Sequence, residues 1–207
     1  MDENTEYKDS MNCFQRFIKR AFDIFFSLIG IIVLSPLYIL IYLCFLFSGG
    51  KAIYSQERVG YKGKIFKIYK YRTMVRNAEI NGQIPRSREE RDEKLTKIGR
   101  VLRAHHLDEL PQLWNVLIGD MSFVGPRPER QFFIDQINAV TSNYKYIYKM
   151  RPGLTSSATI YNGYTDTLEK MITRLEMDVE YYTIRSLWHD FKIIVVTVWK
   201  IVSGSKF

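Results

Sequence analysis

The sequence predicts a mainly α-helical protein with a small β-hairpin, held at a membrane by an N-terminal helical hairpin. Residues 24–47 form an almost continuous apolar run. Two short strand-like runs follow, with glycines between them, and most of the remaining chain repeats apolar residues with the helical period. With 207 residues, 46% of them hydrophobic, the chain can bury one sizeable core, so we expect a single domain over residues 1–207.

The chain is strongly basic, with a formal net charge of +8. This charge predicts attraction to polyanions, which include nucleic acid, anionic lipid headgroups and phosphate-bearing substrates. Cys13 and Cys44 are the only cysteines, too few for a disulfide framework or a cysteine-based zinc site. Their number fits a reducing compartment.

The apolar run predicts insertion into a membrane. As a helix it would be about 36 Å long at ~1.5 Å per residue, enough to cross a bilayer. Basic residues flank it on both sides: Arg16, Lys19 and Arg20 before it, and Lys51, Arg58, Lys62, Lys64 and Lys67 after it. A single span cannot place both flanks on the cytoplasmic side, where positive charge concentrates.

Ser35-Pro36 lies in the middle of the apolar run and predicts a bend, because proline removes a backbone hydrogen bond and its ring clashes with the preceding turn. We therefore predict that residues 14–47 form a re-entrant helical hairpin whose two ends return to the cytoplasm. A kinked helix that spans the membrane is the alternative. Residues 1–12 are polar and are expected to be disordered. Arg20 and Asp23 are expected to pair.

Residues 52–56 and 65–71 read as two strands, with Gly60 and Gly63 in the turn between them. The segment KIFKIYKYRTM interleaves basic and aromatic residues, as nucleic-acid-binding surfaces do. Beside a membrane anchor, contact with phosphate or lipid is favoured instead. Most of these lysines are expected to be solvated, and Arg72 is the candidate ligand.

Two adjacent carboxylates, Asp108 and Glu109, follow a predicted helix over residues 95–106 and precede Pro111. Proline suits the first turn of a helix over residues 112–118, so the pair would lie at the positive end of that helix, where a phosphate would also be stabilised. From spacing alone, acids placed there only by the helix dipole remain the simpler interpretation. His105 and His106 point about 100° apart on a helix, so we expect supporting or surface roles and no shared metal.

Residues 168–182 have the pattern of an amphipathic helix, with Glu169, Arg174, Glu176 and Asp178 on its wetter faces. Residues 188–202 are more apolar and carry Trp188 and Trp199. This segment predicts a helix in the plane of the lipid headgroups, with a core helix as the alternative.

The segment LDELPQLWNVLIGDMSFVGPRPE resembles the bacterial sugar transferase family, the small monotopic phosphoglycosyl transferases. The upstream segment QERVGYKGKIFKIYKYRTM, the break at Ser35-Pro36 and the downstream Arg151-Pro152-Gly153 carry the same resemblance, which runs from about Phe14 to the final helix. It implies an enzyme of the bacterial inner membrane whose catalytic part, residues 51–207, faces the cytoplasm.

The resemblance also implies the reaction. Such an enzyme moves a sugar phosphate from a uridine diphosphate sugar to a polyprenol phosphate such as undecaprenyl phosphate, uses magnesium, releases UMP and initiates a glycoconjugate pathway. The partners expected on this basis are the two substrates, membrane lipids and downstream glycosyltransferases. A homo-oligomer is a further possibility. Binding of nucleic acid is not expected.

Five site residues follow from the match. Asp108 corresponds to the nucleophile and Glu109 to the dyad glutamate that helps to hold magnesium. The donor is in water and the acceptor phosphate is in lipid. A covalent aspartyl phosphosugar would replace one direct transfer between them by two easier steps. Arg72, Arg127 and Arg151 would offer planar guanidinium groups to phosphate oxygens, with Arg127 held between two prolines at little entropic cost.

The chain departs from the family after Arg151-Pro152-Gly153. Many members continue with Thr-Gly-Trp-Ala-Gln and Asn-Gly-Arg, whereas this chain has residues 154–159 as LTSSAT and then Asn162-Gly163-Tyr164. The departure concerns substrate identity more than reaction class. Two other functions remain open from sequence: a magnesium-dependent membrane glycosyltransferase that moves the sugar alone, and a noncatalytic basic membrane adaptor.

Overall fold

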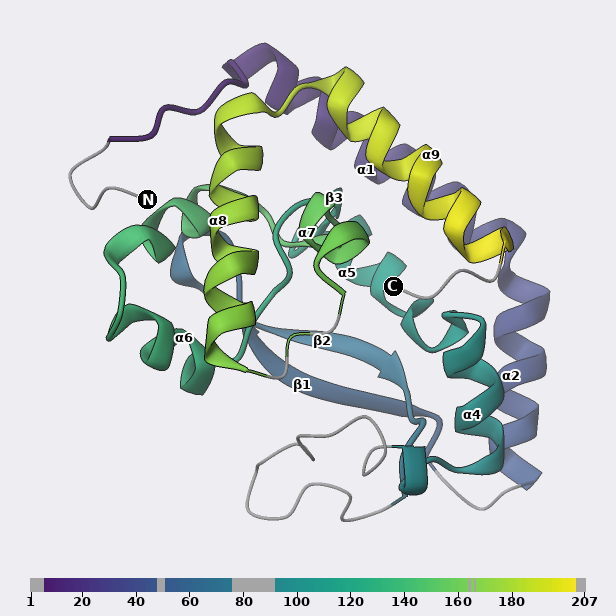
Figure 1. The fold of residues 1–207 in the computed structure, drawn as a ribbon. Coiled ribbons are helices and arrows are strands. Elements are labelled where there is room, and N and C mark those ends of the chain that lie inside the picture. Colours follow the sequence, from purple (N-terminus) through teal and green to yellow (C-terminus); the bar gives the residue numbers. More distant parts are fainter. Residues whose placement is uncertain (1–5, 48–50, 76–91, 164, 166, 204–207) are drawn as a thin grey trace.

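Helices make up most of the described chain, and strands form two small pairs (Figure 1). The structure is a computed structural model that describes residues 6–47, 51–75, 92–163, 165 and 167–203. The α-helices are α1 (Cys13–Val33), α2 (Ser35–Phe47), α4 (Lys97–Ala104), α5 (Gln112–Ile118), α6 (Gln131–Asn138), α7 (Ser157–Tyr161), α8 (Leu168–Ile184) and α9 (Leu187–Ser203). The strands are β1 (Ile53–Val59), β2 (Ile65–Tyr71), β3 (Ser122–Val124) and β4 (Gly153–Thr155), and the 3-10 turns are η1 (Tyr61–Gly63), η2 (Leu107–Glu109) and η3 (Ser142–Lys149).

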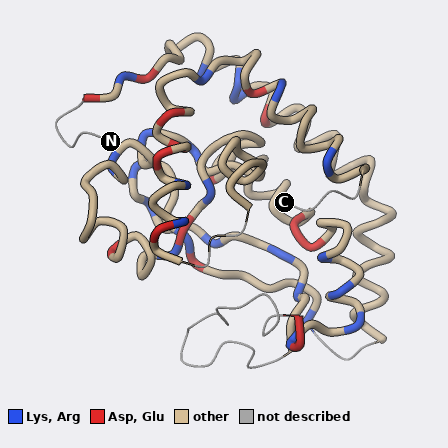
Figure 2. The backbone as a smooth tube through the Cα atoms, viewed as in Figure 1, with Lys and Arg blue, Asp and Glu red and all other residues tan. Residues whose placement is uncertain are grey.

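The predicted bend at Ser35-Pro36 separates α1 from α2, with Leu34 between them. Asn12 caps α1, since its side chain accepts a hydrogen bond from the Gln15 amide while the Gln15 side chain accepts one from the Asn12 amide. No single described helix has the length and apolar character needed to cross a bilayer, whereas α1 and α2 together do, bent by 58°. Neither α2 nor the second half of α1 carries a charged side chain (Figure 2).

The predicted hairpin is present, but its first strand is longer than expected. β1 and β2 are antiparallel, with Ile53 opposite Tyr71 and Val59 opposite Ile65. The prediction ended the first strand at residue 56, directly before Glu57 and Arg58. The ladder continues through them because Glu57 lies opposite Lys67, so unlike charges face each other across the pair.

The largest buried cluster joins α6, η3 and α8, with Ile193 contributed by α9. The prediction of polar exposure along α8 is correct for Glu169 and Glu176 and wrong for Arg174 and Asp178, which are buried. Helical periodicity identifies one apolar face but does not reveal that other segments cover a second, charged face.

The predicted disorder of the N-terminal segment is wrong for residues 6–12, and residues 1–5 lie outside the described part. Met11 is only 2% exposed. The Tyr7 ring packs edge-on against Tyr146 at 5.1 Å, and the Asp9 carboxylate accepts hydrogen bonds from both Nε and Nη2 of Arg185 at 2.8 and 2.5 Å. A bidentate ion pair therefore ties this polar segment to the end of α8.

Helix α1 is fastened to the rest of the protein by polar contacts, and α9 runs beside it (Figure 1). The expected pairing of Arg20 with Asp23 is replaced by contacts to other elements. Arg20 donates to the carbonyls of Val116 and Leu117 at the end of α5, at 2.6 and 2.8 Å. Asp23 accepts hydrogen bonds from Ser122 Oγ and the Phe123 amide, both at 3.1 Å.

Candidate active site

Asp108 and Glu109 lie in η2, the tight turn between α4 and α5. His106 adopts the left-handed backbone conformation, with φ of 54°, which ends α4 and starts the turn. The predicted helix over residues 112–118 is confirmed as α5, and Pro111 is its N-cap. Both carboxylates therefore precede the N-terminus of a helix, as the sequence predicted, although α5 is short.

Apolar residues on both sides of the carboxylate pair pack against α2. Leu107 and Leu110 contact the cluster that contains Ile41 and Phe45 of that helix. In addition, the Tyr38 hydroxyl of α2 donates a hydrogen bond to the Leu110 carbonyl at 2.6 Å. The fold thus holds the acidic turn directly against the apolar N-terminal helices.

Glu109 is paired with a lysine of the hairpin. Its Oε1 accepts a hydrogen bond from Lys70 Nζ at 2.5 Å, and both side chains are largely covered, with 27% and 21% exposed. Burial alone would raise the pKa of Glu109, but the charges of Lys70 and Arg127 outweigh it and lower the pKa to about 2. Glu109 is therefore an anion throughout the physiological range.

Asp108 has a different environment. It is 9% exposed, and its carboxylate has no hydrogen-bond partner among the described residues. Burial, together with the neighbouring Glu109, raises its pKa, while Lys70, Arg103 and His106 oppose that shift. Glu109 is thus held as a paired anion, whereas Asp108 is buried without a hydrogen bond from any described side chain.

The three candidate arginines do not share one position. Arg72 directly follows β2, two residues after Lys70, and its side chain makes no hydrogen bond or ion pair with a described residue. Arg127 is close enough to lower the pKa of Glu109. Arg151 is held elsewhere, because its Nε donates to the Gly119 carbonyl at 3.0 Å and its guanidinium lies 5.3 Å from the Tyr61 ring centre.

Close approach of two backbone segments sets the positions of Arg127 and Arg151. β3 and β4 are parallel neighbours, with Ser122 opposite Gly153 and Val124 opposite Thr155. A Cβ atom on Gly153 would lie 2.2 Å from the Gly125 nitrogen, so only glycine allows this approach.

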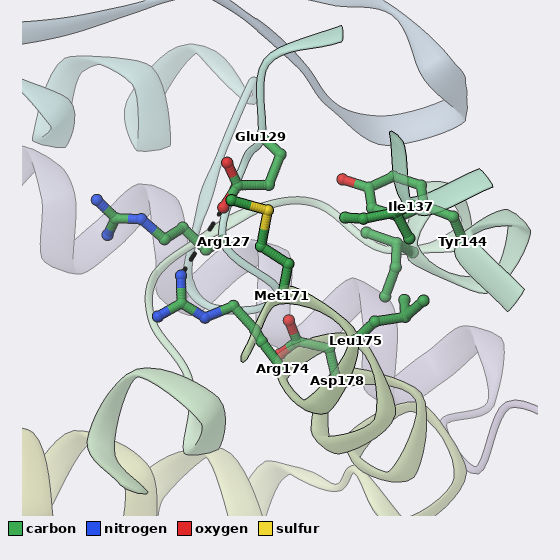
Figure 3. A pocket seen from close by; sticks show the side chains of 9 residues that line it. Arg127, Glu129, Ile137, Tyr144, Met171, Arg174, Leu175 and Asp178 are labelled. Carbon is green, nitrogen blue, oxygen red and sulfur yellow. Dashed lines mark ion pairs between the residues drawn. The ribbon is translucent and has the colours of Figure 1, made fainter. Parts of the chain in front are cut away.

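A buried charge cluster lies behind Arg127 (Figure 3). Glu129 contacts Arg58 at 3.5 Å and Arg174 at 3.8 Å, while the Arg127 guanidinium points away from the other side chains of the cavity. Burial raises the pKa of Asp178 to about 7, and its Oδ1 has no partner among the described residues. The cavity, of about 20 Å³, holds about one water molecule and is too small for a substrate.

The two carboxylates fit a magnesium ion only if the substrate completes its shell. The described residues contain no group of three or more His, Cys, Asp or Glu side chains arranged around a metal position. Magnesium takes one or two protein carboxylates and otherwise binds phosphate oxygens and water. Glu109, an anion with Oε2 free of Lys70, meets this requirement together with the adjacent Asp108.

Sequence reasoning missed Lys70. The prediction retained Arg72 from the basic and aromatic segment and treated the lysines as solvated. Residues two apart on a strand share a face, so a ligand assignment for Arg72 could also have been extended to Lys70.

The segment that departs from the family pattern begins in β4 and continues as α7. Ser156 caps it, since its Oγ accepts a hydrogen bond from the Thr159 amide at 3.0 Å. Lys200 of α9 donates to the Ile160 carbonyl at 2.7 Å, so α7 is fixed between the C-terminal helices. Tyr164 lies outside the described residues.

Comparison with known proteins adds an independent finding. The model of the family described as "Bacterial sugar transferase" matches residues 14–204. The "UDP-N-acetylgalactosamine-undecaprenyl-phosphate N-acetylgalactosaminephosphotransferase" of Aeromonas hydrophila is 38% identical over 189 residues, which cover 91% of this chain and 44% of that protein. The "UDP-glucose:undecaprenyl-phosphate glucose-1-phosphate transferase" of Escherichia coli (strain K12) is 39% identical over 197 residues, covering 94% of this chain and 42% of that protein.

A protein with the same name from Caulobacter vibrioides is 40% identical over 183 residues, covering 87% of this chain and 68% of that protein. The chain therefore spans less than half the length of the first two relatives. The names of these relatives share the lipid acceptor and differ in the sugar.

Proposed function

Because this chain belongs to the bacterial sugar transferase family, as its motifs predicted, we propose that it transfers a sugar phosphate from a UDP-sugar to a polyprenol phosphate, giving a polyprenyl diphosphate sugar and UMP. The names of the relatives support undecaprenyl phosphate as the acceptor. The lipid-linked product would then be the substrate of downstream glycosyltransferases in a glycoconjugate pathway.

One observation carries this proposal: the acidic turn is covered on its apolar side by α2 and on its polar side by Lys70. Leu107 and Leu110 pack against the cluster that contains Ile41 and Phe45 of α2, while Glu109 accepts a hydrogen bond from Lys70. A water-soluble nucleotide sugar and a lipid-embedded phosphate could both reach a nucleophile at such a boundary.

In the first step, an Asp108 carboxylate oxygen attacks the phosphorus next to the sugar. The bond between that phosphorus and the oxygen bridging to the uridine phosphate breaks, and UMP leaves with the electron pair. In the second step, an oxygen of the polyprenol phosphate attacks the same phosphorus. The acyl phosphate bond breaks, and Asp108 returns to a carboxylate.

The surrounding side chains bind and orient the phosphates. Lys70 and Arg127 offset the charge that two adjacent carboxylates and a diphosphate bring together. Arg72 is available to a phosphate oxygen because it has no ion-pair partner among the described residues. A magnesium ion bound by Glu109 and the substrate would further neutralise phosphate charge.

Membrane attachment is part of the proposal. We assign α1 and α2 to a re-entrant hairpin in the inner membrane, with the catalytic part on the cytoplasmic side. The 58° bend and basic residues on both flanks support this placement. On α2, Leu40 and Phe47 are 58% and 90% exposed, as expected for a face in contact with lipid.

A radiolabel on the sugar-proximal phosphate of the donor tests the reaction. Phosphosugar transfer carries that label into the lipid fraction and releases unlabelled UMP. A glycosyltransferase that moves the sugar alone would leave the label on UDP in water, and a noncatalytic adaptor would leave the donor intact. Either of these results would contradict the proposal.

A further inference from the structure

A second cavity lies at the opposite end of the hairpin from the acidic turn. Its volume of about 370 Å³ is within the range of small-molecule sites. It lies beside η1, whereas Lys70 is near the far end of β2, and the five residue steps from Ile65 to Lys70 span about 17 Å at ~3.3 Å per residue. This cleft is therefore separate from Asp108 and Glu109, although Tyr61, which lines it, also contacts Arg151.

Four parts of the chain meet there: the N-terminal segment with the start of α1, η1, η3 and the end of α8. Its charged lining residues are Arg16, Lys62, Lys149 and Asp9. Asp9 is already bonded to Arg16 at 3.2 Å and to Arg185 at 2.5 Å. The only carboxylate among the described lining residues is thus shared by two arginines, and these residues keep an excess of positive charge.

Neither lysine of the cleft has a carboxylate partner among the described residues. Lys62 Nζ lies 5.3 Å from the Tyr61 ring centre, and Lys149 Nζ lies 5.0 Å from the Tyr146 ring centre. A cation over an aromatic face keeps its hydrogen-bond donors and its charge. The cleft therefore suits an anion.

Two further tyrosines line the cleft and supply neutral donors. Burial raises the pKa of both Tyr148 and Tyr182, so their hydroxyl groups remain protonated at neutral pH. Ammonium and guanidinium groups combined with hydroxyl donors match the oxygens of a phosphate group.

The position of the cleft favours a phosphate that belongs to a lipid. Arg16 stands in the first turn of α1, and its neighbours Phe14 and Phe17 are 69% and 71% exposed. On α9, which lies beside α1, exposed Trp188 stacks on Phe191 at 5.4 Å (Figure 1). Exposed aromatic residues beside basic residues are typical of the headgroup region of a membrane.

We propose that this cleft binds the phosphate headgroup of an anionic membrane lipid, and thereby holds the N-terminal segment and the hairpin turn together at the membrane surface. The inference rests on the membrane attachment in the proposed function, but it does not involve Asp108 or the transfer reaction.

Calorimetric titration of the full chain in neutral detergent tests this site. The probe is dihexanoyl phosphatidylglycerol below its micelle concentration, compared with dihexanoyl phosphatidylcholine and with glycerol phosphate. We expect saturable binding of the anionic lipid and weaker binding of the other two. Lys62→Gln and Lys149→Gln should each weaken that binding about five-fold, since a basic residue near an anionic headgroup contributes about 1 kcal/mol.

Lys145→Gln is the matched control, because Lys145 lies on η3 beside the same Tyr146 ring, at 5.3 Å, but does not line the cleft. It should leave the affinity unchanged. Equal weakening by Lys145→Gln, or no saturable binding, would overturn the proposal. Glycerol phosphate that binds as tightly as the lipid would also overturn it, by assigning the cleft to a soluble phosphate.

The Asp108→Asn variant separates this inference from the proposed function. It should bind the short-chain anionic lipid as the unmodified chain does while losing sugar phosphate transfer. If the unmodified chain transferred sugar phosphate normally but bound no lipid in the cleft, the cleft assignment would be wrong and the proposed function would stand.

Discussion

The contact between Lys70 and Glu109 defines the candidate site at the level of single residues. Lys70→Gln removes the nearest cation from a largely covered carboxylate, so burial should then raise the pKa of Glu109 from about 2. The acid limb of the pH–rate profile should move to higher pH, and the rate at pH 7 should fall by about 10²-fold. UMP release measured from pH 4 to pH 9 checks both effects.

Lys67→Gln is the control for this change, because Lys67 lies on the same strand but is exposed and opposite Glu57. It should retain the rate and the pH profile of the unmodified chain. An unchanged acid limb in Lys70→Gln would show that the ion pair does not control the ionisation of Glu109.

Asp178 predicts a pH-dependent stability. Its pKa is about 7 in the folded chain and near 3.8 in the unfolded chain, so the folded state binds the proton more tightly between these values. The stabilisation from protonated Asp178 is full below about pH 4 and is lost as the pH rises to about 7. Asp178→Asn cannot ionise at this position, so its stability should not change with pH for this reason. Between pH 5 and pH 8 the melting temperature of the unmodified chain should therefore fall relative to that of the variant.

A constant difference in melting temperature across that range would contradict the assignment. Glu129 and Arg174 face Asp178 in the same cluster, and both remain in the variant. The comparison therefore isolates the titration of one carboxyl group.

Motif and position made Asp108 and Glu109 candidates from the sequence, and the structure shows why Lys70 could not be singled out as readily. Three lysines share the hairpin segment, and only tertiary packing decides that Lys70 reaches the acidic turn. Likewise, the burial of Arg174 and Asp178 depends on neighbouring segments that helical periodicity does not reveal.

Among the elements, α2 has two apolar faces with different partners. Ile41 is 6% exposed and belongs to the cluster against which Leu107 and Leu110 pack, while the adjacent Leu40 is 58% exposed. Leu40→Glu should keep the melting temperature in detergent but weaken membrane retention, because a charged side chain is costly in lipid. Ile41→Glu should lower the melting temperature strongly, because it buries an unpaired charge.

Carbonate extraction of membranes and thermal melts in detergent measure these two effects separately. If Leu40→Glu were extracted no more readily than the unmodified chain, the exposed face of α2 would not be a lipid contact.

Element boundaries were most accurate where local signals were strong. β2 and α5 match the predicted ranges because alternation and Pro111 mark their limits. The pairing of β3 with β4 was not predicted, since each has three residues and they join segments far apart in the sequence. Here the close approach of Gly125 and Gly153 allows the pair to form, and local propensity does not reveal it.

At the scale of the whole molecule, the mainly helical architecture with a small β-hairpin followed from the sequence, because the turn glycines and the helical periods are local signals. The packing of α1 against α5 and its position beside α9 (Figure 1) did not follow from the sequence. They depend on contacts such as Arg20 with the end of α5 and Lys19 with Asp190 at 2.5 Å, which connect distant segments.

The re-entrant hairpin predicts that both ends of the chain lie on one side of the membrane. Single cysteines at Lys8 and Ser203, introduced with Cys13 and Cys44 replaced by serine, should both react with an impermeant maleimide in inside-out vesicles and be protected in right-side-out vesicles. Reaction of the two positions on opposite sides would identify a spanning helix.

The most direct test of the account is a search for the covalent intermediate by mass spectrometry. The chain is incubated with a panel of UDP-sugars without acceptor, quenched and digested. We predict a phosphosugar on the peptide that contains Asp108, lost on addition of polyprenol phosphate and absent from Asp108→Asn. Sugar phosphate transfer that proceeds without this adduct and survives in Asp108→Asn would contradict the account.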